Sequence, residues 1–322
     1  MSFQALLLLL SITPFSSQAP VAKRAYSNGP VITSDFADPA FINVGGTYYA
    51  FATTNGAQNI QIATSPDFDT WTVTGDDALR SIPSWSTGET WAPDVIQIAD
   101  GSFVLYFAAA SSTNTNMHCV GTATSLTVEG PYTASDTAFA CPLDQGGAID
   151  PAGFTDSDGS LYVVYKVDGN SLGGGGTCGN GDGAYSTPIM LQGVEADGIT
   201  MTGTATQILD RGTSDGPLIE APSLVLVSGT YYLFFSSNCY NGPEYDTSYA
   251  TASAVGGPYT KASSPLLVSG GDGGALNSPG SATVGSAGAQ MVFHSDSVAG
   301  DSALRQMWTA GISIGGGVVG IS

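Results

Sequence analysis

Charged residues are scarce in this chain of 322 residues: they make up 11% of it, against roughly 25% in typical soluble domains. Basic residues are the rarest, with seven Lys and Arg against 27 Asp and Glu, which gives a formal net charge of -20. Such a surface repels nucleic-acid phosphates and anionic membranes, so neither is an expected partner. A neutral substrate fits this charge better, and the charge also favours solubility in an acidic exterior.

Zinc-binding patterns and membrane spans are also missing. There are only two His and no CxxC pair, so a zinc site is not expected. The one long apolar run, around Leu6 to Leu10, is too short to cross a bilayer. Helical periodicity is nearly absent after this run, which excludes a helical bundle.

The N-terminus has the pattern of a secretory leader. The apolar run ends near Ser16-Ser17-Gln18-Ala19, and the dibasic pair Lys23-Arg24 follows. We therefore predict a signal peptide with a short dibasic-processed pro-segment over residues 1–24. Residues 25–322 are predicted to form a single catalytic domain that is secreted, extracellular and monomeric.

Export makes disulfide bonds the expected state of the four cysteines. Three pairings are possible, and the sequence does not choose among them. Cys119–Cys141 is favoured because its short separation suits neighbouring strands, which leaves Cys178–Cys239 as the second bond.

What the chain has in abundance is Gly, with 43 residues, together with 14 Tyr and 13 Phe. One pattern recurs: an acidic or Pro-containing turn, a short apolar segment, a Gly turn and an aromatic strand. Four copies are clear and a fifth, at Pro279, is weaker; the clear copies begin at Asp38-Pro39, Trp91-Ala92-Pro93-Asp94, Asp150-Pro151 and Glu220-Ala221-Pro222. Five units of about 55 to 70 residues predict an all-β, five-bladed β-propeller.

The acids of these repeats are the candidate functional residues. In a propeller the innermost strands start near the central axis, so equivalent positions of successive blades converge on one pocket. Asp38, Asp94, Asp150 and Glu220 are all placed at such starts. Clustered carboxylates repel one another and perturb each other's pKa, which acid–base catalysis requires. The alternative is that Asp-Pro and Pro-Asp are ordinary turn formers.

These motifs resemble those of glycoside hydrolase family 43, over about residues 26 to 322. The resemblance rests on Asp38-Pro39, Asp150-Pro151, Glu220-Ala221-Pro222 and Trp91-Ala92-Pro93-Asp94. It implies an inverting mechanism in which Asp38 is the general base, Glu220 the general acid, and Asp150 the residue that orients Glu220 and keeps it protonated.

Further site candidates follow from position and resemblance. Trp91 either stacks on a sugar ring or is a core residue, and Asp94 is a pocket residue by its motif. Arg305 either offsets the charge of the pocket or lies on the surface. His294 is either structural or, as the resemblance implies, a ligand of a calcium ion held mostly by water. The chemistry itself is expected to need no cofactor.

The resemblance implies a substrate among the plant cell-wall polysaccharides or oligosaccharides. The leading expectation is an α-L-arabinofuranosidase on arabinan or arabinoxylan. β-Xylosidase and endo-1,5-α-L-arabinanase activities are alternatives within the family. A non-catalytic carbohydrate-binding propeller is the alternative of another class, and it would not need Asp38, Asp150 and Glu220 together.

Overall fold

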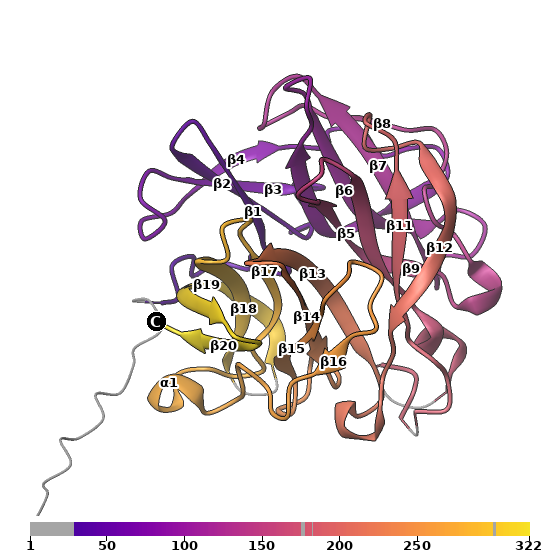
Figure 1. Cartoon of the computed structure of the whole chain (residues 1–322). Helices are drawn as coiled ribbons and strands as arrows, with labels where there is room; N and C mark the ends of the chain where they lie inside the picture. The colour runs from indigo at the N-terminus through magenta and orange to yellow at the C-terminus, as the bar shows by residue number, and fades with distance from the viewer. Residues whose placement is uncertain (1–28, 175–177, 182, 299–300) are drawn as a thin grey trace, which may run out of the picture.

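The computed structural model of the protein describes residues 29–174, 178–181, 183–298 and 301–322. Within these ranges the chain forms five antiparallel sheets of four strands each, which confirms the predicted all-β, five-bladed propeller (Figure 1). The predicted signal peptide and pro-segment, residues 1–24, lie outside the described residues. No helix of the described part has the length and apolar character needed to cross a membrane.

Each blade follows chain order, so its strands run from the innermost to the outermost. Blade 1 contains β1 (Ala40–Val44), β2 (Thr47–Ala52), β3 (Gln61–Ser65) and β4 (Thr72–Asp77). Blade 2 contains β5 (Ser86–Gln97), β6 (Phe103–Ser111), β7 (His118–Ser125) and β8 (Thr133–Ala134). Blade 3 contains β9 (Ala148–Thr155), β10 (Leu161–Val167), β11 (Ile189–Val194) and β12 (Met201–Leu209). Blade 4 contains β13 (Ile219–Val227), β14 (Thr230–Ser237), β15 (Asp246–Ala252) and β16 (Thr260–Lys261). Blade 5 contains β17 (Gly280–Val284), β18 (Gln290–Val298), β19 (Asp301–Gly315) and β20 (Val318–Ile321).

Helical segments are short in the described part. They are the 3-10 turns η1 (Leu143–Gln145), η2 (Gly169–Leu172) and η3 (Thr213–Asp215), and one turn of α1 (Gly271–Gly274).

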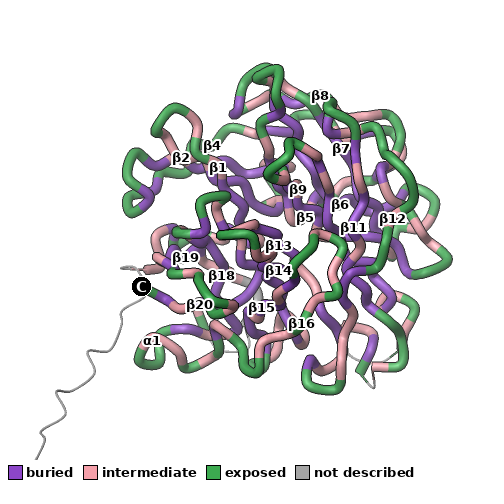
Figure 2. Tube along the Cα trace, viewed as in Figure 1, coloured by how far each residue is buried: buried purple, intermediate pink, exposed green. Residues whose placement is uncertain are grey.

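Burial follows the position of a strand within its blade. All nine residues of β6 are buried, as a continuous apolar run predicts for a strand covered on both faces. In contrast, β4 at the outer edge of blade 1 is exposed along most of its length. Figure 2 shows the same gradient, with buried segments inside and exposed ones at the periphery. The core therefore lies between blades.

The hydrophobic core consists of five clusters, one between each pair of neighbouring blades. Phe51 of blade 1 packs in one cluster with Leu105 of blade 2, and Phe41 of blade 1 packs in another with Val292 of blade 5. The other three clusters join blades 2 and 3, blades 3 and 4, and blades 4 and 5. Because each blade is covered by both neighbours, the ring is closed and the inner strands are held at fixed positions around the axis.

The segment before β1 also closes the ring. Ile32 forms an antiparallel bridge with Met307 of β19, and the amide of Phe36 donates to the carbonyl of Arg305 at 2.8 Å. Asp35 accepts a hydrogen bond from the amide of Arg305 at 3.0 Å. The first and last parts of the propeller are thereby joined directly beside Asp38.

Each innermost strand has a left-handed residue at the same place. Asp38, Ala92, Asp150, Ala221 and Ser281 have φ of 52, 43, 55, 52 and 50°. Such values cost about 1–3 kcal/mol for residues other than Gly. The pairing register shifts here in blades 2 to 5, as in a β-bulge, which re-aims side chains at the end of a strand.

This left-handed position revises the expected equivalence of the four acids. Asp38 and Asp150 are true equivalents. Glu220 precedes the corresponding Ala221 by one residue, and Asp94 follows the corresponding Ala92 by two. Because neighbouring residues of a strand point in different directions, the four carboxyl groups do not share one orientation.

The favoured disulfide pairing is confirmed. Cys119 is bonded to Cys141, with their Cα atoms 4.5 Å apart, and Cys178 is bonded to Cys239, with their Cα atoms 5.8 Å apart. The first bond joins β7 of blade 2, which contains Cys119, to the segment after β8, where Ala140 forms a β-bridge with Val120. The second joins a loop of blade 3 to a loop of blade 4.

Candidate active site

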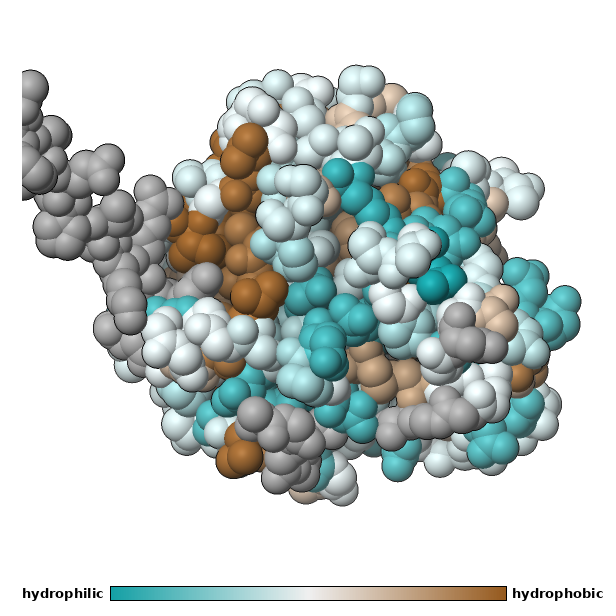
Figure 3. Space-filling model, turned by 90° about the horizontal axis from the view of Figure 1, so that it is seen from below, coloured by the Kyte–Doolittle hydropathy of each residue, from teal (hydrophilic) through white to brown (hydrophobic). Residues whose placement is uncertain are grey.

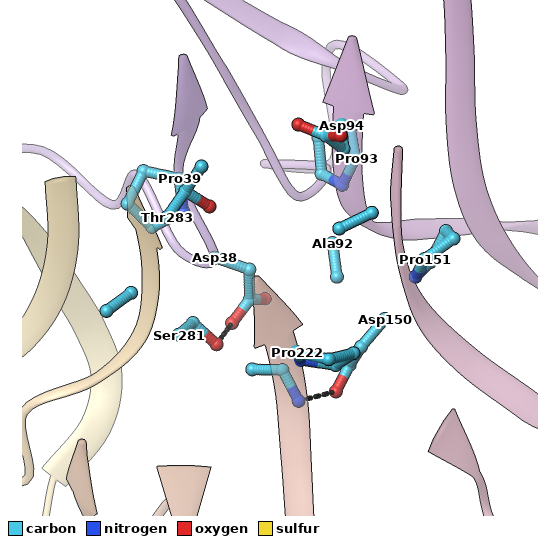
Figure 4. A pocket seen from close by; sticks show the side chains of 13 residues that line it. Asp38, Pro39, Ala92, Pro93, Asp94, Asp150, Pro151, Pro222, Ser281 and Thr283 are labelled. Carbon is cyan, nitrogen blue, oxygen red and sulfur yellow. Dashed lines mark hydrogen bonds between the residues drawn. The ribbon is translucent and has the colours of Figure 1, made fainter. Parts of the chain in front are cut away.

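Two spaces in the described part of the chain share Asp38, Asp150 and Ser281 in their linings. The larger one, called the large cavity below, has a volume of about 320 Å³. It is lined from all five blades; among its residues are Asp38, Trp91, His118, Asp150, Lys166, Asp168, Glu220, Tyr240, Tyr245, Ser281 and Arg305. The second space, the axial pocket, holds about 30 Å³ and is lined by the bulge residues and Asp94 (Figure 4). The structure thus brings Asp38, Asp150, Glu220, Trp91 and Arg305 to one cavity.

The carboxylate of Asp38 is surrounded by donors. Thr53 donates a hydrogen bond to its Oδ2 at 2.6 Å, and Ser281 donates to its Oδ1 at 2.9 Å (Figure 4). The guanidinium of Arg305 lies 3.3 Å from Oδ1. Burial acts to raise the pKa of Asp38, but Arg305 and the hydrogen bonds outweigh it and hold that pKa well below its usual range. Asp38 is therefore a fixed, ionised carboxylate.

Asp150 has the opposite electrostatics. Its Oδ2 accepts a hydrogen bond from the amide of Ala221 at 2.8 Å (Figure 4). Burial, and then the nearby charge of Glu220, raise the pKa of Asp150 well above its usual value, and Lys166 offsets only part of this rise. Asp150 therefore retains its proton at a pH where an exposed Asp has lost it.

Glu220 is held at both oxygens. Tyr245 donates its hydroxyl proton to Oε1 at 2.9 Å, and the ammonium of Lys166 donates to Oε2 at 3.0 Å. The same ammonium lies 2.9 Å from Asp168 Oδ1. Burial alone would lower the pKa of Lys166, but Asp168, Glu220 and Asp150 raise it, so this fully buried side chain is a cation.

Besides Tyr245, the aromatic side chains of Trp91 and Tyr240 line the large cavity. The indole of Trp91 stacks on the imidazole of His118, with ring centroids 3.7 Å apart and planes 26° apart. Tyr240 lies with its ring centroid 5.4 Å from Cζ of Arg305, in cation–π contact. Of the two interpretations open for each, Trp91 is a cavity residue rather than a core residue, and Arg305 contacts Asp38 rather than lying free on the surface.

Asp94 and His294 lie away from the large cavity lining. Asp94 lines the axial pocket, where its Oδ2 accepts a hydrogen bond from the amide of Gly153 at 2.7 Å. Figure 4 shows it next to Pro93, apart from Asp38 and Asp150. His294 is buried against Tyr245, and its Nδ1 accepts the amide proton of Asp38 at 3.1 Å. Burial lowers the pKa of His294, so its imidazole is neutral.

The structure gives no support for a calcium ion at His294, whose Nε2 has no hydrogen-bond partner in the described part of the chain. No group of three or more His, Cys, Asp or Glu among the described residues could hold a metal ion. The contacts of His294 instead join blade 5 to blade 1 behind Asp38.

Sequence reasoning missed Lys166, Asp168, Tyr240 and Tyr245. A signal existed for Lys166, because it is a lone charge within the apolar strand Leu161–Val167. Buried Lys is almost always paired, so its position predicts an acidic partner on a neighbouring element. No comparable signal marks the two tyrosines, which lie in the loop between β14 and β15.

Asp94 predicts a measurable pH dependence of stability. Burial raises the pKa of Asp94 from 3.8 to about 6, and the amides of Gly153 and Val95 offset this only in part. Between pH ~4 and ~6 the folded chain binds a proton that the unfolded chain has lost, so stability is complete below this window and falls as pH rises through it. Asp94→Asn should flatten the decline of melting temperature between pH 4 and 7, because it removes a loss of about 2 kcal/mol of unfolding free energy over this range.

Glu129→Gln is the control for this experiment, because Glu129 is exposed and its loss should leave the slope unchanged. Thermal melts at five pH values measure both variants. If melting temperature falls with pH equally in the wild type and in Asp94→Asn, the pKa of Asp94 is not raised in the folded protein.

Comparison with known proteins gives the relatives of the chain. Residues 27–309 match the family described as Glycosyl hydrolases family 43. Extracellular endo-alpha-(1->5)-L-arabinanase 1 of Bacillus subtilis is 27% identical over 73% of this chain and 70% of its own length. Probable arabinan endo-1,5-alpha-L-arabinosidase C of Aspergillus flavus is 32% identical over 63% of this chain and 58% of its own length.

Among solved structures, a thermostable family-43 glycoside hydrolase has the same fold, with a TM-score of 0.78 at 24% identity. This match covers 92% of the present chain and 96% of that one. Family, fold and the carboxyl groups of one cavity agree: the chain belongs to glycosyl hydrolase family 43, an inverting family whose chemistry needs no cofactor and whose members act on pentose polysaccharides.

Proposed function

We propose that the protein is an endo-1,5-α-L-arabinanase that cleaves linear arabinan within the chain. The observation that carries this proposal is the single cavity shared by Asp38, Asp150 and Glu220. The choice of arabinan, and of endo action over the exo arabinofuranosidase expected first, is supported by the relatives, which bear arabinanase names.

In this proposal Asp38 is the general base. It accepts a proton from a water molecule as the water oxygen attacks the anomeric carbon. The contacts that keep Asp38 ionised also make it a weak base. Its contribution then comes from orienting the water and from stabilising the oxocarbenium-like charge that develops on the sugar. Thr53, Ser281 and Arg305 fix its orientation.

Glu220 is the proposed general acid. It gives its proton to the glycosidic oxygen as the bond to the anomeric carbon breaks, so each turnover consumes one water and inverts the anomeric centre. Tyr245 and Lys166 hold its two oxygens. Asp150, whose raised pKa keeps a proton in the Asp150–Glu220 pair at mildly acidic pH, is proposed as the proton reserve and orienting neighbour.

Trp91 and Arg305 are proposed to bind substrate, since both line the large cavity beside the carboxyl groups. Secretion is proposed as well. Its support is the leader pattern of residues 1–24, the two disulfide bonds, and the extracellular names of relatives. The catalytic domain is then residues 25–322.

The test is a product analysis on linear arabinan, arabinoxylan and the nitrophenyl glycosides of α-arabinofuranose and β-xylose. We expect the viscosity of linear arabinan to fall early, ahead of the release of reducing ends, and the first-formed anomer to be inverted by NMR. Free arabinose released without loss of viscosity would indicate the exo arabinofuranosidase instead. Turnover of the xyloside alone would indicate a xylosidase, and no turnover with retained binding a carbohydrate-binding propeller.

A further inference from the structure

The loop between β14 and β15, residues 238–245, reaches the large cavity at two places. Tyr245 at its end donates to Glu220, and Tyr240 near its start lines the cavity with a half-buried ring. The proposed function uses Tyr245 but gives no role to Tyr240.

This loop is anchored covalently next to Tyr240. Cys239, the residue before it, is bonded to Cys178 of blade 3, and Cys178 also lines the large cavity. Tyr240 and the bond between Cys178 and Cys239 therefore form one wall of the cavity at the junction of blades 3 and 4. This disulfide, which closes a separation of 61 residues, ties the loop of blade 4 covalently to blade 3.

The ring of Tyr240 is also fixed from a second side. Arg305 lies 5.4 Å from the ring centroid, and its guanidinium in turn contacts Asp38 at 3.3 Å. Arg305 thus lies between the Tyr240 side chain and Asp38, the proposed base. Because a tyrosine has few rotatable bonds, little entropy is lost when a ligand packs on a ring already held in this way.

Tyr240 has a counterpart across the cavity. Trp91 comes from blade 2 and Tyr240 from blade 4, with blade 3 between them. Each ring is backed by a nitrogen-containing group, His118 for Trp91 and Arg305 for Tyr240. The cavity is thus lined by aromatic rings from blade 2 and from blade 4, an arrangement that suits a chain of sugars lying across it.

We propose that Tyr240, held by Arg305 and by the Cys178–Cys239 bond, is a binding subsite for a pentofuranose unit of the polymer on the far side of the scissile bond from Trp91. The apolar face of a sugar ring would pack on the phenol ring, whose hydroxyl stays available to a sugar hydroxyl. Figure 3 shows one face of the molecule, on which hydrophilic residues gather near the centre. The inference rests on the proposed function for the nature of the sugar.

The experiment measures the KM of arabino-oligosaccharides of two to six units for wild type, Tyr240→Ala and Tyr240→Phe. A unit that reaches Tyr240 is present only in the longer substrates. We expect Tyr240→Ala to raise the ratio of the hexaose KM to the biose KM at least tenfold, and Tyr240→Phe to change it less than threefold. An unchanged ratio, or an equal rise in both KM values, would overturn the subsite.

Matched controls separate this role from folding. Tyr185 is an exposed tyrosine, 41% accessible, outside the cavity lining, so Tyr185→Ala should leave the ratio unchanged. The Cys178→Ser, Cys239→Ser pair should raise the ratio, whereas the Cys119→Ser, Cys141→Ser pair should change melting temperature alone. A rise with both cysteine pairs would indicate general loosening and would overturn the anchoring role.

Binding distinguishes failure of this inference from failure of the proposed function. If the wild type cleaves no arabino-oligosaccharide, the proposed function is wrong. Calorimetry with arabinohexaose and xylohexaose then decides on Tyr240 separately. The subsite stands if Tyr240→Ala weakens the binding of either hexaose at least tenfold, and it is wrong if the affinity is unchanged or neither hexaose binds the wild type.

Discussion

Glu220→Gln is expected to cleave linear arabinan about 10³-fold more slowly than the wild type, because a positioned acid contributes roughly 10² to 10⁴ to the rate. The amide has the shape of the carboxyl group and still accepts from Tyr245 at Oε1, but it has no proton to give to the leaving oxygen. Initial rates on arabinan at the pH optimum measure the loss. A variant with wild-type turnover would exclude Glu220 as the acid.

Substrates with different leaving groups distinguish the role of the acid from that of the base. A dinitrophenolate departs without protonation, so Glu220→Gln should lose far less activity on dinitrophenyl α-arabinofuranoside than on arabinan. Asp38→Asn is the matched control, since a missing base slows the attack of water on both substrates to a similar extent. If both variants responded to the leaving group in the same way, the assignment of the two roles would not hold.

The repeat pattern was sufficient to predict the fold and to place Asp38, Asp150 and Glu220 at one cavity. The innermost strands of a propeller all begin near the central axis, and this does not depend on the length or conformation of the loops. The same reasoning was less accurate for Asp94, because it counted residues from Pro and could not see the left-handed bulge. Two residues beyond that bulge, the Asp94 side chain bonds to the amide of Gly153 in blade 3.

Loop residues could not be placed in this way. Tyr240 and Tyr245 reach the cavity from a segment without a repeat counterpart. Tyr240 lies next to the Cys178–Cys239 bond and contacts Arg305, and Tyr245 contacts Glu220 and His294. That disulfide bond was expected only as the pair left over from Cys119–Cys141, and the sequence did not show that it borders the cavity. The repeats could therefore place the carboxyl groups but not the loop residues that line the rest of the cavity.

In blades 3, 4 and 5, one residue of the second strand pairs with the start of the bulge of the innermost strand, and the residues at this position explain the role of Lys166. In blade 4 this position is held by Ser236 and in blade 5 by His294, and each accepts an amide proton from the next blade, that of Ser281 or Asp38. Lys166 has no acceptor to offer. In blade 3 Asp150 accepts the amide proton of Ala221 instead, which leaves the ammonium of Lys166 free to join Asp168 to Glu220.

Lys166→Met should therefore be the most destabilising single change at this site. It leaves the carboxylate of Asp168, and the pair of Asp150 and Glu220 that shares a proton, buried without their cation, and breaking a buried pair on one side costs about 3–5 kcal/mol. Burial acts to raise the pKa of Asp168, and Lys166 is the main group that holds it low. Without Lys166, burial of Asp168 is no longer offset, so its pKa rises in the variant and the carboxyl group takes up a proton as pH falls. The deficit should therefore be largest near pH 7 and shrink as pH falls toward ~4. Denaturant unfolding at pH 7 and pH 4.5 measures it.

A double-mutant cycle with Asp168→Asn identifies the cause. If the loss is electrostatic, Lys166→Met with Asp168→Asn is more stable than Lys166→Met alone, because one uncompensated charge has been removed. If the loss is only a packing defect, the second substitution adds its own cost and the double variant is less stable still. The two accounts thus predict opposite signs for the effect of Asp168→Asn in the Lys166→Met background. If Asp168→Asn stabilises the Lys166→Met variant, the cation of Lys166 is what keeps three carboxyl groups, those of Asp150, Asp168 and Glu220, within one buried site.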